Sequence, residues 1–559
     1  MKRSTSLSAR GATRWLLPGF FAGLIAGVVM LLIMALLRLF GFVPTPTELI
    51  FDRAFPLVSI DFFIWSLVQA NGYTPLKLSG IFAALAGQLF VAGLAGAIYA
   101  WISERVWVER DAGFLRRSHL SARSWWLVVP GVVAVWLLFV ALLGPQLLTN
   151  YRGLPPARAT FVSCLGMLVS FGVCGWTLAH AYALLTQPRP TTVLASDDPA
   201  AKSLARRRFL VTGIGALAAV ALGGALRRLF RLGTFAYDGT EYLGPDVQKI
   251  TPNDRFYQVT KNLVDPDVAR DLWRLEFTGH VEAPRVLTFA ELTALPAVEQ
   301  ETTLQCISYR VGGGLISNAL WKGVPLPALL AIVRPKADAV AVLFHAADGY
   351  FETFSIAKAH EPTTLVVWEM NGAPLTPRHG FPVRLVVPGL YGERSAKWVT
   401  RLEFLAANDP RLQRNRHGVK GVGFYTEQGW GPNIVVPTTS RFDAPKVAGD
   451  RFAEPFTAGQ PVELRGMAFG GDQGISKVEV SFDDGETWQD APITAPGSNK
   501  LSWSLWTLAW TPAAAGDHRL QVRATNGAGE LQSTEQRNTV PQGALGLHKV
   551  RATVVAARA

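Results

Sequence analysis

The sequence predicts a multidomain chain with three parts: an N-terminal bundle of transmembrane α-helices, a central α+β domain and a C-terminal all-β sandwich. Hydrophobic residues make up 49% of the chain and are concentrated before Leu226. The residues that follow have the composition of water-soluble domains, with many Gly and Pro turns. We place the three parts at residues 1–232, 233–444 and 445–559.

The N-terminal part contains apolar runs of the length that a bilayer requires, roughly 20 residues. A helix in the core of a soluble protein would carry a polar face at helical spacing, and these runs have none. Four strong runs and a weaker fifth predict transmembrane helices at residues 15–40, 78–102, 125–148, 159–185 and 209–226.

The loops between these runs alternate in charge. Lys and Arg cluster at the N-terminus and in residues 105–123 and 202–208, whereas the intervening loops carry Glu48 and Asp52. Positive charge stays on the cytoplasmic side. The pattern predicts a multi-pass protein of a bacterial cytoplasmic membrane, with everything after the fifth helix on the periplasmic or extracellular side. The basic cluster at residues 227–231 opposes this assignment.

Arg206-Arg207-Arg208 precedes a short, Gly-rich and mildly apolar segment. This entry resembles a twin-arginine signal, which directs the export of folded proteins. The alternative is an ordinary basic flank of a membrane helix.

Strands and short helices alternate in the central part. Trp273–Phe277 alternates as a strand, Glu291-Leu292 lies in a short helix, and Ala339–His345 and Val383–Val387 are buried strands. Such a mixture favours an α+β domain over a doubly wound sheet.

The C-terminal part has short strands with period-two alternation and a hairpin turn at Asp483–Glu486. Strands of this length and spacing predict an immunoglobulin-like sandwich. We expect four tryptophans to fill its core or an interface: Trp488, Trp503, Trp506 and Trp510. The predicted strands are Pro461–Met467, Ser476–Phe482, Leu501–Thr507 and His518–Thr525.

Charge and cysteine content exclude two classes. The net charge of +12 could indicate nucleic-acid binding, but many of the arginines flank apolar helices, so we predict no nucleic-acid partner. Three cysteines exclude a disulfide framework. Cys306 is the only cysteine outside the apolar N-terminal third, and it is either a buried apolar filler or a reactive or metal-bound thiolate.

Several motifs surround Cys306 in a fixed order. They are Asn253-Asp254-Arg255-Phe256-Tyr257, Thr303-Leu304-Gln305-Cys306, Gly312–Leu326, Glu369–Leu375, His379–Arg384, Val387-Pro388-Gly389 and Gly392–Trp398. Together they resemble the sulfite oxidase family of mononuclear molybdenum enzymes, from about Pro252 to the C-terminus. The resemblance implies molybdenum and a molybdopterin as cofactors, and a C-terminal domain that can mediate a homodimer.

The resemblance also implies roles for single residues. Cys306 matches the thiolate that is the only protein ligand to molybdenum, and the pterin supplies two more sulfurs. Arginine suits the pterin phosphate because its guanidinium can bind two oxygens at once. The cofactor-binding positions implied are Asn253, Phe256, Tyr257, Cys306, His379, Arg384, Arg394, Ser395 and Lys397.

The sequence departs from the family where the substrate would bind. Val311 stands where the family has an arginine, and Arg310 would face the other way in a strand. Lys261 is the nearest cation after Phe256-Tyr257, where the family has an arginine. Tyr309 stands where the family usually has an asparagine, and Trp430 replaces a pocket tyrosine. We therefore predict Cys306, Tyr309, Lys261 and Trp430 as catalytic or pocket residues. Fewer cations and more aromatic groups favour a larger or neutral substrate such as a sulfoxide.

The expected activity is oxygen-atom transfer on a small, sulfur-containing substrate outside the membrane. No Cys-x-x-Cys-His motif or cytochrome b5-like segment is present, and His180 stands alone near a helix end. We therefore predict no haem and a separate electron carrier, either a cytochrome or a quinone-linked protein. Two alternatives stay open: a sulfoxide-type reductase rather than a sulfite oxidase, and a non-catalytic membrane-tethered binding module.

Overall fold

A computed structural model gives the fold. It describes residues 9–70, 73–108, 122–148, 152, 154, 156–186, 240–262, 265–415, 418–431, 434–539 and 542–557. The predicted fifth helix and the arginine triplet before it lie outside these residues. Contacts divide the chain into two compact units, of which the second consists of residues 52–76, 151–154 and 237–559.

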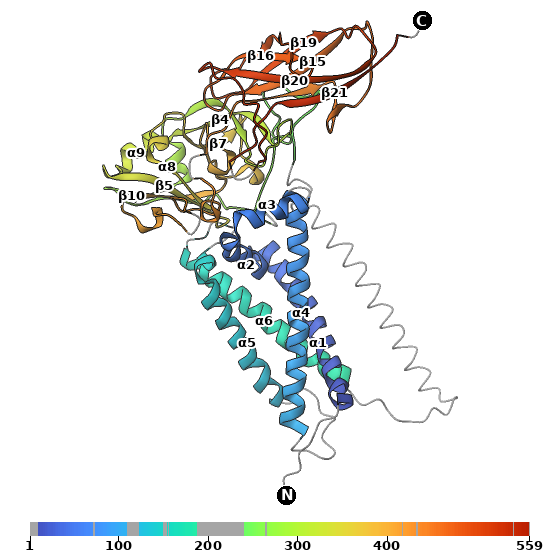
Figure 1. The fold of residues 1–559 in the computed structure, drawn as a ribbon. Coiled ribbons are helices and arrows are strands. Elements are labelled where there is room, and N and C mark those ends of the chain that lie inside the picture. Colours follow the sequence, from blue (N-terminus) through green and yellow to red (C-terminus); the bar gives the residue numbers. More distant parts are fainter. Residues whose placement is uncertain are drawn as a thin grey trace. The chain divides into compact units, whose positions relative to one another are not determined.

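The first unit is helical (Figure 1). Four of its helices are long and apolar enough to cross a membrane, which confirms the four strong apolar runs as helices. The third ends at Leu143, earlier than predicted, because Gly144-Pro145 begins a 3-10 turn. The helices are α1 (Ala9–Gly41), α2 (Pro46–Ala54), α4 (Tyr73–Val108), α5 (Ala122–Leu143), η2 (Gly144–Leu148) and α6 (Pro156–Thr186).

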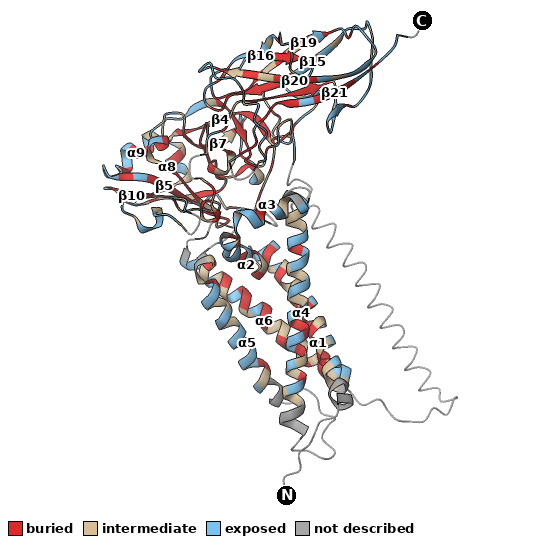
Figure 2. Cartoon of the chain, in the orientation of Figure 1, coloured by how far each residue is buried: buried red, intermediate tan, exposed pale blue. Residues whose placement is uncertain are grey.

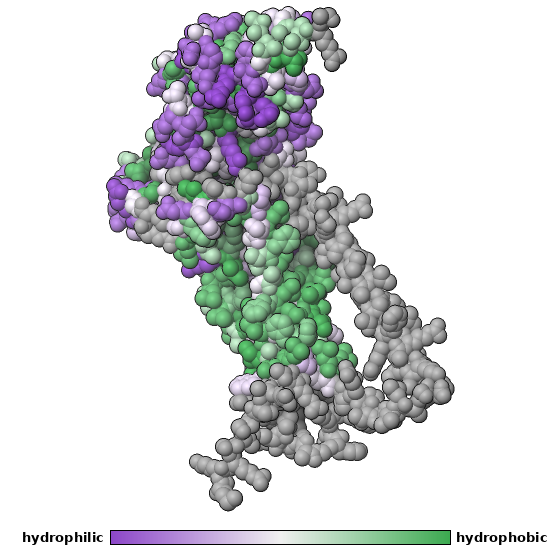
Figure 3. All heavy atoms as spheres, turned by 45° about the vertical axis from the view of Figure 1, so that its right-hand side comes forward, coloured by the Kyte–Doolittle hydropathy of each residue, from purple (hydrophilic) through white to green (hydrophobic). Residues whose placement is uncertain are grey.

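Small residues bring α1 and α4 together. A Cβ at Gly23 would lie 2.1 Å from the Ala92 carbonyl oxygen, and one at Gly96 would lie 2.2 Å from that of Gly19. Close backbone approach of this kind is typical of helix pairs in membranes. Large apolar side chains cover the outside of the helices, which are green in Figure 3, and Phe82 is 62% exposed.

The central region of the second unit is built on two sheets. The first has the order β2-β1-β10-β5-β6, and the second has the order β3-β4-β7-β8 with β9 paired to β7. One large core lies among these strands and three short helices, and its buried residues are red in Figure 2. The strands are β1 (Arg274–Gly279), β2 (Arg285–Thr288), β3 (Val298–Gln305), β4 (Ile316–Pro325), β5 (Ala339–Ala346), β6 (Phe351–Ser355), β7 (Leu365–Met370), β8 (Ala373–Pro374), β9 (Arg384–Val386) and β10 (Val399–Ala406). The helices are α8 (Phe289–Thr293), α9 (Leu326–Val333) and α10 (Ile356–Ala359).

Local sequence signals explain how these elements begin and pair. Thr288 and Glu291 form a reciprocal capping box at the start of α8, as the Thr-x-x-Glu spacing requires. Strands β3 and β4 pair in antiparallel register, with Gln305 opposite Ile316. The chain between these two residues therefore makes a reversal, and Cys306 is its first residue.

The C-terminal region contains only sheets among its described elements. One sheet has the order β11-β15-β19-β18 and the other β12-β13-β21-β20-β16-β17, with β14 paired to β21. Side chains from both sheets share one core, and β21 alternates strictly between buried and exposed residues. The strands are β11 (Thr439–Ala444), β12 (Val447–Ala448), β13 (Arg451–Phe452), β14 (Phe456–Thr457), β15 (Val462–Phe469), β16 (Ile475–Ser481), β17 (Gln489–Asp490), β18 (Ile493–Ala495), β19 (Ser504–Trp510), β20 (Gly516–Asn526) and β21 (His548–Val555).

A short segment from the N-terminal third also belongs to the second unit. It contains a 3-10 turn, η1 (Phe55–Leu57), and a short helix, α3 (Ile60–Gln69). Phe55 and Phe63 are buried in the same hydrophobic core as Cys306 and Trp430. The sequence did not predict this association.

Candidate functional site

Cys306 lies where a buried strand ends. Its backbone N–H donates to the Leu315 carbonyl at 3.0 Å, and its own carbonyl accepts from the N–H of Tyr309 at 3.0 Å. The residue is 8% exposed and forms no disulfide. The paired ends of β3 and β4 thus fix the position of one nearly buried thiol.

The thiol lines a cavity of about 130 Å³. The cavity brings together predicted residues from separate segments of the chain. Those that line it are Phe256, Tyr257, Lys261, Cys306, His379, Arg384, Ser395, Lys397 and Trp430. Asn253, Tyr309 and Arg394 are not among the lining residues.

Two of the residues outside the lining have partners of their own. The Asn253 amide donates to the Met370 carbonyl at 3.2 Å and accepts from the Asn371 side chain at 2.6 Å. The Tyr309 hydroxyl lies 3.2 Å from the Thr439 hydroxyl, and the tyrosine is buried. Tyr309 therefore packs behind the turn that carries Cys306. We had expected its side chain to line the pocket.

Cations gather in one part of the cavity lining: Arg378, Arg384 and Lys397. Arg384 is buried, and its guanidinium donates to the carbonyls of His379 at 3.3 Å and Ser395 at 2.9 Å. Burial lowers the Arg384 pKa to about 10, so the group is still charged at neutral pH. A buried cation that is held by neutral carbonyls suits an anionic ligand.

His379 ends a 3-10 turn, η4 (Pro377–His379), and its Nε2 lies 2.7 Å from the Asn253 carbonyl oxygen. Burial lowers the His379 pKa to about 4, so the ring is neutral at pH 7. A carbonyl can only accept, so Nε2 carries the proton and Nδ1 keeps a lone pair. His379 can therefore accept a hydrogen bond from a ligand at Nδ1.

A buried acidic pair holds Arg394, which lies in η5 (Gly392–Arg394). The guanidinium Nη1 lies 3.4 Å from Glu352 and 3.2 Å from Glu393, and Nη2 donates to the Gly431 carbonyl. Glu352 also accepts from the backbone N–H groups of Tyr425 and Thr426. The sequence reading missed Glu352, since a single glutamate in an alternating strand carries no signal.

Aromatic rings form another wall of the cavity. Tyr425 and Trp430 stack with ring centroids 4.6 Å apart, and they flank the 3-10 turn η7 (Thr426–Gln428), whose start Glu352 binds. Within the part of the chain that the structure describes, the buried Trp430 Nε1 has no hydrogen-bond acceptor. An orphaned donor in a cavity wall is a natural partner for a bound oxygen atom.

Tyr257 lies close to the backbone beside Cys306. A Cβ at Gly392 would lie 2.3 Å from the Tyr257 hydroxyl oxygen and 3.3 Å from the Gln305 carbonyl. Only glycine at position 392 admits this hydroxyl. Burial raises the Tyr257 pKa, so the side chain is a neutral phenol and a hydrogen-bond donor.

We expect a pH-dependent contribution to stability from Glu393, a cavity residue that is buried. Burial raises its pKa from 4.5 to about 7, so the folded chain holds this proton more tightly than the unfolded chain. The stabilisation is fully present below pH 4.5 and is lost as the pH rises to about 7, by about 3 kcal/mol. In Glu393→Gln this loss should disappear.

Thermal melting of both chains from pH 4.5 to 8 measures the effect, with the exposed Glu299→Gln as the matched control. The melting temperature of wild type should fall relative to that of Glu393→Gln across this range, and Glu299→Gln should follow wild type. Parallel curves for wild type and Glu393→Gln would contradict a raised pKa.

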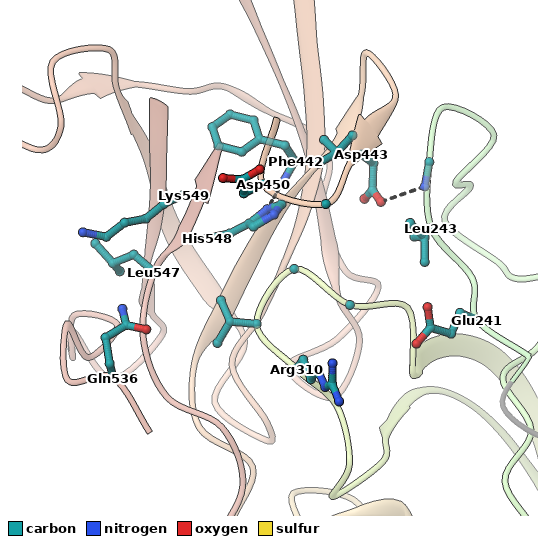
Figure 4. A pocket seen from close by; sticks show the side chains of 16 residues that line it. Glu241, Leu243, Arg310, Phe442, Asp443, Asp450, Gln536, Leu547, His548 and Lys549 are labelled. Atoms are coloured by element: carbon teal, nitrogen blue, oxygen red, sulfur yellow. Dashed lines mark hydrogen bonds between the residues drawn. The ribbon is translucent and has the colours of Figure 1, made fainter. Parts of the chain in front are cut away.

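A second cavity, of about 680 Å³, lies on the other side of the glycine-rich turn. Figure 4 shows Arg310 and Glu241 on one side of it and His548 and Lys549 on the other. Arg310 and Val311 both line this cavity and not the one with Cys306.

The expectation that these two residues alternate in a strand is therefore wrong. Strand β3 ends at Gln305, and residues 306–315 form turns. Gly312 has a φ of +81°, and a Cβ there would meet the His548 ring at 2.4 Å. The absence of a cation at Val311 thus says nothing about the cavity of Cys306, whose lining includes Lys261.

Two family profiles match the second unit. The profile described as "Oxidoreductase molybdopterin binding domain" matches residues 262–412, and the "Mo-co oxidoreductase dimerisation domain" matches residues 447–546. The first range contains Cys306 and most of its cavity lining. The second contains most of the C-terminal sheets.

Curated relatives match the same region. A protein from Homo sapiens named "Sulfite oxidase, mitochondrial" is 31% identical over 311 residues, which cover 49% of this chain and 55% of the human protein. "Nitrate reductase [NADH]" from Volvox carteri is 31% identical over 252 residues, which cover 39% of this chain and 29% of the alga's protein. The chain thus spans about half the length of the sulfite oxidases that it matches.

One solved structure aligns over 56% of this chain and 85% of its own. It is described as "Sulfane Dehydrogenase SoxCD from Paracoccus pantotrophus", and it has 24% sequence identity and a TM-score of 0.46.

Proposed function

Because the chain belongs to the sulfite oxidase-like family of molybdopterin-dependent oxidoreductases, we propose that its second unit binds a molybdenum–molybdopterin cofactor and transfers an oxygen atom to or from a small substrate. One observation carries the proposal. A nearly buried thiol and four cations line one cavity that no single segment of the chain could form.

The residues present fit such a cofactor. A metal that is bound through sulfur needs a soft thiolate ligand, and the Cys306 thiol, which lines the cavity, can supply it. The buried guanidinium of Arg384 is held by carbonyls and suits a phosphate. The orphaned Nε1 of Trp430 can donate to an oxygen atom near the metal.

We assign the following roles. Cys306 ligates molybdenum, Arg384 and Lys397 bind the pterin phosphate, and His379 accepts a hydrogen bond from the pterin at Nδ1. Phe256, Tyr257 and Ser395 complete the cofactor-facing wall, as their places in the lining support. Asn253 acts through His379, because its backbone carbonyl accepts from Nε2 and so fixes the tautomer of the ring.

Arg394 and Tyr309 also act through other residues. Arg394 holds Glu352 and the turn that presents Tyr425 and Trp430, which supports a positioning role. Tyr309 packs behind the turn that carries Cys306. Neither assignment requires contact with the cofactor, which the sequence reading had expected for Arg394.

The bound cofactor supplies a metal that can accept or give two electrons. In the oxidising direction water provides the oxygen atom, two protons are released and two electrons pass to a separate carrier. In the reducing direction two electrons and two protons are consumed, and the oxygen atom leaves as water. Glu393, which is buried in the cavity wall with a pKa of about 7, can hold or release a proton there.

The substrate that we propose contains sulfur. A sulfoxide-type reductase is the second candidate, because aromatic rings and a neutral His379 line the cavity and Lys261 is paired with Asp52. The proposal would give way to a non-catalytic binding module if the folded protein held no metal.

Metal and pterin analysis of the purified full-length chain tests the proposal. We expect close to one molybdenum and one molybdopterin per chain. Assays with artificial electron carriers in both directions, using sulfite, nitrate and small sulfoxides, then assign the reaction. A stably folded chain that lacks both metal and pterin would overturn the proposed function.

Replacing Arg384 with methionine should weaken cofactor retention. A hydrogen bond to a charged group contributes about 1.5–3 kcal/mol, so the loss is about 10- to 100-fold in affinity. Pterin content after dialysis measures it. Arg285→Met, an exposed arginine on β2, is the matched control and should retain the pterin. Equal pterin content in both variants would remove Arg384 from the phosphate site.

We also propose that the four apolar helices anchor the chain and that the second unit lies on the periplasmic or extracellular side. The alternation of basic and acidic loops along the sequence supports this orientation, because positive charge stays on the cytoplasmic side.

For the C-terminal region we propose an immunoglobulin-like sandwich that mediates a homodimer. The shared core of its two sheets and the match to a dimerisation domain support this proposal. The electron carrier that we propose is a separate cytochrome or quinone-linked protein.

A further inference from the structure

The segment between α1 and α4 forms part of the cavity that contains Cys306. Phe63, on α3, lines the cavity together with Lys261 and Trp430. Its ring centroid lies 6.2 Å from that of Trp430 and 5.5 Å from that of Phe55. A segment from the membrane-helix region therefore contributes a side chain to the active-site cavity.

Phe55 packs this segment against residues 424 and 425 of the same unit. Its ring stacks on Phe424 with centroids 4.8 Å apart and meets Tyr425 edge to face at 6.1 Å. Tyr425 in turn stacks on Trp430. Aromatic pairs of this geometry add to the stabilisation from burial. The segment therefore packs against Tyr425, whose backbone N–H also donates to Glu352.

A buried ion pair also joins residues 52–69 to the region that contains Cys306. The Lys261 ammonium donates to both carboxylate oxygens of Asp52, at 2.8 and 3.0 Å. The side chains are 6% and 10% exposed, so water screens the pair poorly. The pair joins a cation of the cavity lining to a carboxylate from the segment between α1 and α4.

We propose that residues 52–69 form a specificity-determining wall of the substrate cavity, in which Asp52 cancels the charge of Lys261 and Phe63 limits the size of the substrate. The inference rests on the proposed function and deepens it. With Lys261 neutralised, the substrate side of the cavity has no net charge from this pair, which disfavours a dianion such as sulfite. An uncharged oxygen donor or acceptor, such as a sulfoxide, fits the aromatic wall.

The lining also contains Arg378, Asp348 and Glu393, of which Glu393 is paired with Arg394 and Arg378 lies next to His379. Arg384 and Lys397 belong to the cofactor-facing wall that we assign above. Asp348 accepts from the Asn262 amide at 2.9 Å and from the Tyr350 N–H at 3.0 Å, which fixes its carboxylate. We assign the selection of substrate charge to Lys261 with Asp52, because this ion pair joins the segment to the cavity lining.

Equilibrium dialysis of labelled sulfate against full-length holoprotein in lipid nanodiscs tests the charge claim without using activity. Asp52→Asn should bind sulfate at least tenfold more tightly than wild type, because Lys261 loses its counter-charge. The double variant Asp52→Asn/Lys261→Met should return to the wild-type affinity. Asp61→Asn, an exposed aspartate of the same segment, is the matched control and should change nothing.

A separate measurement tests whether Phe63 limits the size of the substrate. Phe63→Ala should raise the ratio of kcat/KM for methyl phenyl sulfoxide to that for dimethyl sulfoxide by at least tenfold, while Phe62→Ala, which is 57% exposed, should not. Molybdenum content is measured for every variant. If the wild-type chain holds molybdenum but the sulfate affinity of Asp52→Asn is unchanged, the inference is overturned and the proposed function is left intact. Tightening that persists in the double variant would also overturn it. Wild-type chains without molybdenum would overturn the proposed function and the inference with it.

Discussion

Replacing Cys306 with serine should abolish oxygen-atom transfer. A serine hydroxyl is a hard and weakly acidic ligand, and it cannot replace a thiolate on a soft metal. Groups that merely support a metal ligand cost about 10- to 100-fold when they are removed, so we expect a loss of more than about 100-fold in kcat. Turnover assays combined with molybdenum and pterin analysis measure the effect.

The pterin content of Cys306→Ser should stay close to that of wild type, because Arg384 and Lys397 remain in place. Cys174→Ser, on α6, is the matched control and should keep full activity. A Cys306→Ser chain with wild-type turnover would show that the thiol is a buried filler after all.

Replacing Arg394 with methionine should strongly destabilise the second unit. The guanidinium is 1% exposed and is the ion-pair partner of both Glu352 and Glu393, so its loss leaves two buried carboxylates facing one another. Breaking a buried pair costs about 3–5 kcal/mol. For a domain of this size we expect the melting temperature to fall by about 6–20 °C.

Arg411→Met is the control, since Arg411 also pairs with two carboxylates but is 42% exposed. Exposed pairs contribute about 1 kcal/mol or less, so the melting temperature should change little. If Arg394→Met melts like wild type but loses its pterin, Arg394 contacts the cofactor, as the sequence had led us to expect.

Much of the fold follows from local sequence patterns. The four strong apolar runs are helices, and the strands around Ala339, Ile475 and Gly516 begin within two residues of where alternation places them. These patterns are visible because each strand or helix has its own periodicity. Motif order likewise indicated most of the cavity lining around Cys306.

The missed features depend on contacts between distant segments. Glu352 binds the backbone of the cavity wall only because the turn at residues 423–426 folds onto it, and a Cβ at Gly423 would overlap the Glu352 carboxylate at 1.5 Å. Asp52 looked like one acidic charge in a loop, and its partner Lys261 lies 209 positions away. Arg310 and Val311 were misplaced because alternation was extended beyond the end of β3.

The second unit is discontinuous in sequence, and this determines the order in which the protein can be completed. Residues 52–69 are synthesised before α4, α5 and α6, whereas Phe424 and Trp430 emerge long after them. The ring of Phe55 can reach Phe424 only after α4, α5 and α6 have been synthesised. A chain shortened to begin after α6 would lack residues 52–69 and leave that aromatic surface bare and prone to aggregation, so the second unit cannot be completed without the N-terminal part of the chain.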